Sequence, residues 1–276
     1  MTPCPLPPRI GLAVAAGLAG AGARVVLSSR RAPHVEAAVG QLRAQGLEVS
    51  GVVCHVGQPH SRQGLIQKAL ETYGGIDILV SNAAVNPVFG PALDADEAAW
   101  EKVWPRPLSH APFPLGHAHP APPIFNPTPP RPPKIFQVNV TAAAMLIKLV
   151  VPHMEKRGGG AIVVVSSVAG YLPFPALGPY SVSKAALLGL VKALAPELRA
   201  RRVRLNAVAP GLVRTRFSAA LWEDEATRQR VMSSMGIERL GTPSDVAEVV
   251  TFLCSPAAAY VVGETVVVAG GAPSRL

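Results

Sequence analysis

The chain has 276 residues, enough to bury the core of one α/β domain or of two small ones. Hydrophobic residues make up 49% of it and charged residues 16%, a balance typical of a globular protein and not of a disordered one. The net charge of +9 suits nucleic acid, an acidic surface or an anionic small ligand, but the dense basic run at residues 199–204 holds no aromatic side chain, which argues against nucleic acid.

From Ile10 onward, apolar strands alternate with amphipathic helices along most of the chain. We predict strands at residues 24–27, 49–54, 78–80, 161–165, 204–208 and 265–268. Helices are predicted between them, at residues 34–45, 65–73, 138–156, 180–199 and 244–253. Strands joined by crossover helices predict a doubly wound parallel sheet, a Rossmann-like α/β fold in a single domain. Ligands then bind at the carboxyl ends of the strands.

Two stretches interrupt this pattern. Residues 105–133 contain twelve prolines, which remove backbone donors and fix φ, so we expect a surface loop or a disordered insert. His110, His117 and His119 within it are irregularly spaced, and we expect no metal site there. The prolines of residues 1–8 exclude a central strand, so the first strand of the sheet is predicted to be missing.

Three residues between positions 166 and 184 form a candidate catalytic group. Tyr180 and Lys184 lie four residues apart at the start of a predicted helix and therefore share one face. The ammonium favours the phenolate, so it is expected to lower the tyrosine pKa and let Tyr180 exchange a proton with a carbonyl or an alcohol. Ser167 closes an apolar strand at the edge where this fold places catalytic groups. Tyr-x-x-x-Lys alone is a weak signal, but the upstream serine makes it a strong one.

With these residues the chain resembles the short-chain dehydrogenase/reductase family, from about Ile10 to the C-terminus outside the proline-rich stretch. The resemblance implies that Ser167 orients the substrate oxygen, Tyr180 donates the proton and Lys184 holds the cofactor ribose. Phe136-Gln137-Val138-Asn139-Val140 is similar to the segment that carries a fourth catalytic member, so Asn139 is expected to help hold a proton-relay water.

Further motifs of the resemblance concern the cofactor. Ser81-Asn82-Ala83-Ala84 is similar to the family turn on the adenine side, which assigns Asn82 to the cofactor site. Residues 206–215 are similar to the segment that frames the nicotinamide. The cofactor-binding residues implied there are Pro210, Gly211, Val213 and Thr215, next to Tyr180 and Lys184.

The sequence favours NADP(H) over NAD(H). Enzymes that use NAD place an acidic residue about 20 positions after the glycine turn, whereas arginine there suits a 2′-phosphate. Counting from Gly11, the second strand ends in Ser29, Arg30 and Arg31, with no carboxylate. We expect these three residues to bind the phosphate; a solvated strand end is the alternative interpretation.

Two departures from the family pattern concern the cofactor and the helix before Asn139. Only the tail of the glycine turn is present, with Arg9 where a glycine is expected and Gly11 as the surviving member. The proline-rich stretch divides the domain into residues 9–104 and 134–276. We therefore keep the hypothesis of an incomplete or mis-spliced product, with a lost first coding segment and an inserted one.

The remaining sequence features concern the cellular location of the protein. Three distant cysteines (Cys4, Cys54 and Cys254) suit a reducing compartment and give neither a disulfide framework nor metal-ligand spacing. No apolar run of the ~20 residues that a membrane span needs was found, and no signal peptide is expected. The ending Ser274-Arg275-Leu276 is close to a peroxisomal import signal, so we expect an import receptor as partner and the peroxisome as location, with the cytoplasm as alternative.

Three functions remain open. The first is an NADP(H)-dependent carbonyl reductase and alcohol dehydrogenase, and several stretches resemble the peroxisomal carbonyl and retinal reductases of the family. The second is an inactive relative that keeps the fold for oligomer assembly. The third is a proline-rich ligand for an SH3-like partner, Pro129-Pro130-Arg131-Pro132-Pro133, which the catalytic residues argue against as a primary role. The family implies a homo-oligomer, expected to be a tetramer. The loop after Gly211 is expected to form an apolar lid over a hydrophobic carbonyl substrate, with core packing as the alternative interpretation; its residues are Phe217, Leu221, Trp222, Met232 and Met235.

Overall fold

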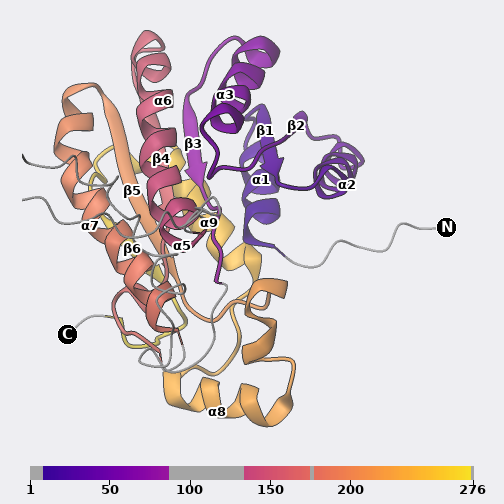
Figure 1. Ribbon diagram of the computed structural model, residues 1–276, viewed down its shortest axis with the longest axis vertical. Helices are drawn as coiled ribbons and strands as arrows, with labels where there is room; N and C mark the ends of the chain where they lie inside the picture. The colour runs from indigo at the N-terminus through magenta and orange to yellow at the C-terminus, as the bar shows by residue number, and fades with distance from the viewer. Residues whose placement is uncertain (1–8, 87–133, 175–176, 275–276) are drawn as a thin grey trace, which may run out of the picture.

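The computed structural model describes residues 9–86, 134–174 and 177–274 (Figure 1). The predictions for residues 1–8, for the proline-rich stretch at 105–133 and for positions 275–276 lie outside the described residues. All six predicted strands form, with bounds shifted by a few residues, and every pairing between them is parallel. The predicted α/β fold with crossover helices is therefore confirmed.

The strands are arranged in two sheets. β1 (Val25–Ser29) pairs with β2 (Val49–Val53) in a two-stranded sheet. The other sheet has the order β3-β4-β5-β6, with bounds Ile78–Ser81, Gly160–Val165, Val203–Pro210 and Thr265–Val268. No described strand pairs with the edges of β1 and β3 that face each other. Figure 1 shows the two-stranded sheet set apart from the larger one.

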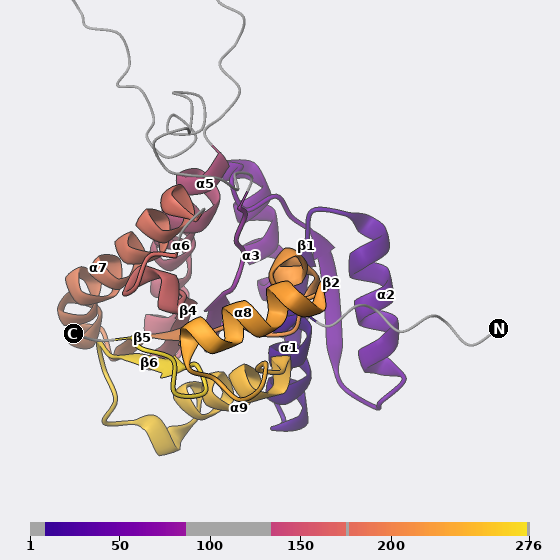
Figure 2. The same ribbon diagram turned by 90° about the horizontal axis from the view of Figure 1, so that it is seen from below.

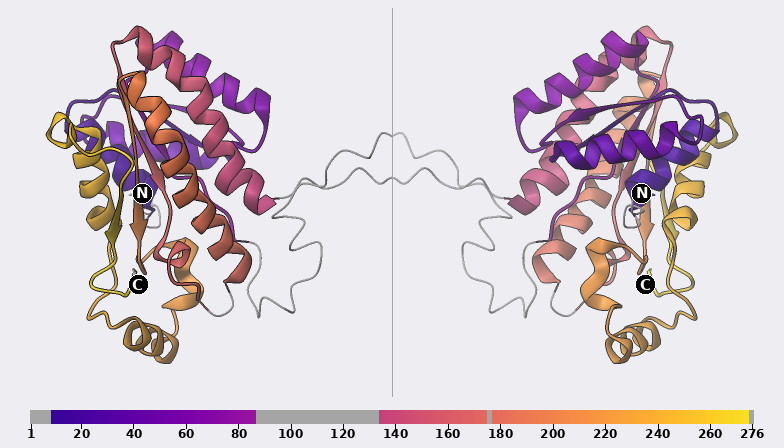
Figure 3. Two further views of the ribbon diagram at one scale, coloured as in Figure 1. Left: turned by 90° about the vertical axis from the view of Figure 1, so that its left-hand side faces the viewer. Right: turned by 90° about the vertical axis from the view of Figure 1, so that its right-hand side faces the viewer.

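Helices cover both faces of the sheets (Figure 2). α3 (Pro59–Tyr73), α6 (Ala142–Lys156) and α7 (Gly178–Ala200) pack through apolar side chains on one face, against β3, β4 and β5. The opposite face is covered by α1 (Ile10–Gly20) and α9 (Pro243–Cys254), with α2 (Ala32–Arg43) against β1 and β2. Figure 3 shows these layers from both sides.

The central strands are buried on both faces, because helices lie above and below them. Ala161, Ile162, Val163 and Val164 of β4 are all buried, which explains why this strand reads as an unbroken apolar run. Gly160 begins β4 at a place where a Cβ atom would lie 2.8 Å from the carbonyl oxygen of Asp77. The start of the strand therefore needs glycine for close packing.

One helical run, Gln137–Lys156, is long and apolar enough by length and composition to cross a membrane. Half of it is buried inside the fold. Its buried residues, Leu146 and Val150 among them, pack against the sheet and α3, so it is a core helix of this domain. The sequence prediction that no apolar run reaches spanning length therefore underestimated this segment.

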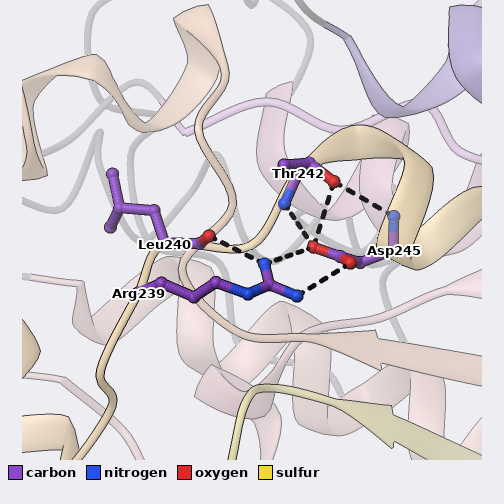
Figure 4. A network of polar contacts seen from close by, with 4 residues as sticks. All are labelled: Arg239, Leu240, Thr242 and Asp245. Atoms are coloured by element: carbon purple, nitrogen blue, oxygen red, sulfur yellow. Dashed lines mark hydrogen bonds and ion pairs between the residues drawn. The ribbon is translucent and has the colours of Figure 1, made fainter.

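The last part of the chain closes the carboxyl end of the sheet. It contains η3 (Arg216–Leu221), α8 (Glu225–Met235) and a polar cap on α9. Thr242 and Asp245 exchange hydrogen bonds between side chain and backbone, and Arg239 donates to both carboxylate oxygens of Asp245 at 2.7 and 3.0 Å (Figure 4). This capping box fixes where α9 begins.

Candidate active site

Tyr180 and Lys184 lie on the first two turns of α7, where Pro179 helps to start the helix. Their side chains are buried, at 8% and 1% exposure. The Lys184 Nζ donates a 2.8 Å hydrogen bond to the carbonyl oxygen of Val165 and lies 5.6 Å from the centroid of the Tyr180 ring. The predicted pairing of these two side chains on one helix face is therefore present.

The pKa values of this pair differ from the expectation. Burial raises the pKa of Tyr180 to about 12, although the nearby Ser167 hydroxyl lowers it in part. Burial lowers the pKa of Lys184 to about 7. The sequence argument considered only the attraction between the ammonium and the phenolate, whereas in the fold desolvation opposes the charged form of both groups. The predicted lowering of the tyrosine pKa is therefore wrong for the protein without ligands.

Ser167 lies at the junction between β4 and a short 3-10 turn, η2 (Val168–Gly170). Its hydroxyl accepts a 3.2 Å hydrogen bond from the backbone N–H of Ala169 and lies 3.5 Å from the carbonyl oxygen of Pro210. The Ser167 side chain also forms a hydrogen bond with Tyr180, so the fold brings these two residues together.

Asn139 lies in a π-helical turn, η1 (Gln137–Thr141), directly before α6. Its amide oxygen accepts from the backbone N–H of Val85 at 2.8 Å, and its Nδ2 donates to the carbonyl oxygen of Val85 and to Ser183 Oγ. Ser183 in turn donates to the carbonyl oxygen of Tyr180. The side chain thus joins the segment after β3 to the catalytic helix. π-Turns inside helices are frequent at functional sites.

Ser167, Tyr180 and Lys184 line a cavity of about 1350 Å³, whereas Asn139 is not among its lining residues. Its volume exceeds the range of about 300–1,000 Å³ usual for a pocket that holds one small ligand. The predicted nicotinamide-side residues line it together. They are Pro210, Gly211, Val213 and Thr215.

Local structure fixes each of these four positions. Gly211 donates to Val268 and approaches Ala269 so closely that a Cβ atom would lie 2.9 Å from the Ala269 Cα. Thr215 caps η3, where its hydroxyl lies 3.1 Å from Ser218 Oγ. The segment after β5 is therefore held rigidly along the cavity wall.

The amino end of α1 forms another part of the wall. Arg9 precedes the helix in an extended conformation with no side-chain cap, and Gly11 is the second helical residue. Gly11 therefore belongs to the helix and not to a turn, a difference from the sequence interpretation. A Cβ atom at Gly11 would lie 2.8 Å from the Asn82 Nδ2, so the glycine permits close contact between α1 and the end of β3.

Positive charge gathers at the mouth of the cavity. Ser29, Arg30 and Arg31 line it at the end of β1, as predicted for a phosphate site. Partial burial, and then the charges of Arg9, Arg31 and Arg216, lower the pKa of His34. Sequence reasoning noted the charge of Arg9 at the glycine turn but missed His34 and Arg216, because positions 9, 34 and 216 come together only in the fold.

The predicted lid is partly confirmed in its position. Phe217, Leu221 and Met235 line the cavity, and the Phe217 ring lies 5.8 Å from the Tyr180 ring, centroid to centroid. Trp222 instead donates from its indole to the carbonyl oxygen of Thr215 and to Ser218, and it packs with Met232 below the lid. These two residues support the lid.

Elsewhere in the described residues, no group of three or more His, Cys, Asp and Glu side chains is placed to hold a metal ion. Burial raises the pKa of Cys54, and that of Cys254 to about 12. The basic run at 199–204 is partly structural, because Arg204 donates to the carbonyl oxygens of Leu253 and Ser255.

Comparisons with known proteins give one consistent result. Residues 9–108 match the family profile described as short chain dehydrogenase, and residues 115–273 match one described as enoyl-(acyl carrier protein) reductase. Dehydrogenase/reductase SDR family member 4 of Oryctolagus cuniculus is 50% identical over 267 residues, which cover 97% of this chain and 90% of that protein.

Comparison with solved structures leads to the same group of proteins. A short-chain type dehydrogenase/reductase from Mycobacterium ulcerans has a TM-score of 0.80 and 27% identity, covering 96% of this chain and 86% of the other. A 7α-hydroxysteroid dehydrogenase, solved with NADH and 7-oxo glycochenodeoxycholic acid, has a TM-score of 0.79 and 29% identity. The match covers 97% of this chain and 91% of the other.

Proposed function

Because the chain belongs to the short-chain dehydrogenase/reductase family, we propose that it is an NADP(H)-dependent oxidoreductase that interconverts an apolar ketone or aldehyde and its alcohol. The observation that carries the proposal is that Ser167 and the buried Tyr180 and Lys184 line one cavity, together with several arginines. A nicotinamide dinucleotide supplies or accepts the hydride when it is bound.

The chain's own residues move the proton. Tyr180, with a pKa of about 12, is protonated at neutral pH and ready to donate to a carbonyl oxygen. Ser167 presents a hydroxyl beside it that can hydrogen-bond the same oxygen. Lys184, with a pKa near 7, changes charge close to neutrality, so its protonated form can stabilise the phenolate that the donation leaves.

The cofactor fits the residues along the cavity. The amino end of α1 offers backbone N–H groups that suit a pyrophosphate. Arg30 and Arg31, with Arg9 and Arg216 close to His34, offer positive charge for a 2′-phosphate. Gly211 and Thr215 line the same cavity as Tyr180. We assign these segments to pyrophosphate, adenosine and nicotinamide, respectively.

The proposal is tested with the Tyr180→Phe variant. It keeps the ring but removes the proton donor, so turnover of an apolar diketone or of retinal by NADPH should fall by at least about 100-fold. NADPH binding, followed through the intrinsic tryptophan fluorescence to which Trp222 contributes, should be unchanged. Equal turnover by the variant and the unaltered protein would refute the assignment of Tyr180.

Cofactor preference is tested separately with Arg31→Gln. Loss of one positive charge at the mouth should weaken NADPH binding by about tenfold, with little effect on NADH, which lacks the 2′-phosphate. Lys192→Gln is the control, because that lysine pairs with Glu264 at the surface, away from the cavity lining. A similar loss for both cofactors would contradict a phosphate role for Arg31.

An inactive relative is the second candidate. It is favoured by Arg9, which stands with no side-chain cap at the start of α1, and by the unpaired facing edges of β1 and β3. Absence of saturable NADPH binding at millimolar concentration would support this candidate. Saturable binding with turnover would exclude it.

The proposal also covers the substrate class, the oligomeric state and the cellular location. The lid residues Phe217 and Leu221 favour an apolar carbonyl compound such as a retinoid or an aromatic diketone. We propose a homotetramer, tested by light scattering, and import into peroxisomes through residues 274–276. Deletion of those three residues should move a fluorescent fusion of the chain into the cytoplasm.

A further inference from the structure

The part of the cavity that lies between β1 and β3 is here called the inter-strand cleft. Residues Val25–Ser29 line it on one side and Ile78–Ser81 on the other. Both strands run in the same direction. At their amino ends the Arg24 guanidinium lies 5.3 Å from the ring of Tyr73, the last residue of α3, and at the carboxyl end of β3 Gly11 approaches Asn82.

The backbone on both sides of the cleft presents hydrogen-bonding groups. Val25 donates to Glu48 and Ser29 accepts from Cys54, so these two residues turn their backbone groups toward β2. Because the groups alternate along a strand, those of Val26 and Ser28 point into the cleft. On β3, Asp77 accepts from Ala161, and the same alternation turns Ile78 and Val80 toward the cleft.

Apolar helices close the cleft on its two open faces. Val14 and Leu18 of α1 pack with Val25, Ile78 and Val80 on one face. Residues of α3 and α6 line the other face of the same cavity. They are Leu65, Ile66, Ala69, Leu146 and Val150. The cleft thus has polar edges and apolar faces, which is the environment of a central strand in a parallel sheet.

We infer that the inter-strand cleft accepts an extended peptide strand supplied in trans, which pairs with β1 and β3 and joins the two sheets. An alkyl chain would fill the apolar faces but leave the backbone groups of Val26, Ser28, Ile78 and Val80 without partners, which is costly when they are buried. A peptide strand can form hydrogen bonds with these backbone groups. Its preferred sequence is a proline-free run of valine and isoleucine, because both of its faces meet apolar helices.

The chain's own residues 1–8 do not suit the cleft. Pro3, Pro5 and Pro7 alternate, so all three would turn toward the same neighbouring strand. Proline has no N–H, and that neighbour would therefore receive no hydrogen bonds from them. This mismatch argues against residues 1–8 as the source of the strand.

The test uses a synthetic peptide with the sequence of β4, Gly-Ala-Ile-Val-Val-Val, preceded by two lysines for solubility and amidated at its carboxyl end. At 100 times its dissociation constant it should raise the thermal midpoint by about 5–10 °C. It should also slow hydrogen exchange at the backbone amides of Val26, Ser28, Ile78 and Val80, a readout that needs neither cofactor nor turnover.

Two controls separate a paired strand from an apolar filler. The same peptide with N-methyl groups on alternate residues keeps its side chains but loses N–H donors, so it should bind at least about tenfold more weakly. Val26→Pro removes a cleft-facing N–H and leaves the β1–β2 bonds in place, so it should weaken binding of the unmodified peptide. Equal stabilisation by the N-methylated peptide or by decanoate, or no binding at 1 mM peptide (roughly the weakest affinity of interest), would overturn the inference.

Discussion

At the scale of single residues, burial governs the catalytic pair. Lys184 has a pKa of about 7 in the fold against an ordinary value of 10.5, because its charged form is desolvated. Between these two pH values the unfolded chain binds more protons than the folded one, so stability should increase with pH across that window. The contribution of Lys184 to stability is least favourable below pH 7, where its buried amine must be charged.

The Lys184→Met variant tests this linkage, because methionine has a similar length and no charge. The unaltered protein should gain up to about 1.4 kcal/mol of unfolding free energy per pH unit between pH 7 and 10.5, and the variant should gain less. Urea unfolding followed by circular dichroism at several pH values measures the difference. Identical slopes would mean that Lys184 is not desolvated.

Asn139 offers a second prediction at this scale. Asn139→Ala removes the partners of both backbone groups of the half-buried Val85, and each of them should cost roughly 1 kcal/mol, the low end of the range for buried groups. Thermal unfolding should therefore show a loss of at least about 2 kcal/mol. Ser183→Ala keeps both bonds to Val85 and should cost less. If the two variants lose the same stability, the contacts with Val85 contribute little.

The residue types of the site could be predicted from sequence, but their electrostatics could not. Ser167, Tyr180 and Lys184 were found because their spacing on a strand and a helix is local. The direction of the Tyr180 pKa shift depends on burial by Phe217 and other distant residues, which spacing does not reveal. The contribution of Arg216 to the cavity mouth was missed for the same reason.

At the scale of elements, the cap of α9 sets a helix boundary that the sequence places correctly to within a residue. Thr242 accepts from Asp245 N–H, and Arg239 holds the pKa of Asp245 below its ordinary value of 3.8. The carboxylate is therefore charged at any pH above about 4, and its stabilising contribution is lost only as the pH falls through the acid range.

Thr242→Ala should cost about 1 kcal/mol and lower the thermal midpoint by about 2–4 °C, because the first turn of α9 loses a side-chain acceptor. Thr242→Ser keeps the hydroxyl and is the matched control, expected to behave nearly as the unaltered protein. Scanning calorimetry at pH 7 compares the three. A midpoint for the alanine variant equal to that of the serine variant would show that the cap is dispensable.

Not every element was foreseeable. The π-turn Gln137–Thr141 has the same polar and apolar pattern as an ordinary helix start, so periodicity predicts only helix there. The strands were easier, because β4 and β5 are largely buried and β4 consists of β-branched and small apolar residues. Gly11 was misplaced because a glycine before a helical pattern can lie either in a turn or in the first helical turn.

At the scale of the whole molecule, the division into two sheets predicts unequal local stability. A two-stranded sheet is marginal by itself, and β1 and β2 depend on α1, α2 and α3 for support. Val53 at the end of β2 is 50% exposed, whereas Val163 and Leu205 in the larger sheet are fully buried. The smaller sheet should therefore open without unfolding of the larger one.

Hydrogen exchange followed by mass spectrometry measures this difference. Backbone amides of β1 and β2 should exchange at least about tenfold faster than those of β4 and β5, because local opening costs less than global unfolding. The α7 segment serves as an internal reference, since its apolar face packs on the larger sheet. Equal protection of both sheets would show that they unfold as one unit.

The position of Tyr180 has an electrostatic consequence. It is the third residue of α7, a helix of 23 residues, and side chains in a helix lean toward its amino end. The aligned peptide dipoles of such a helix place about half a positive elementary charge at that end. A phenolate formed at Tyr180 is therefore stabilised by the helix itself, so the proton can leave the tyrosine even in those molecules in which Lys184 is neutral.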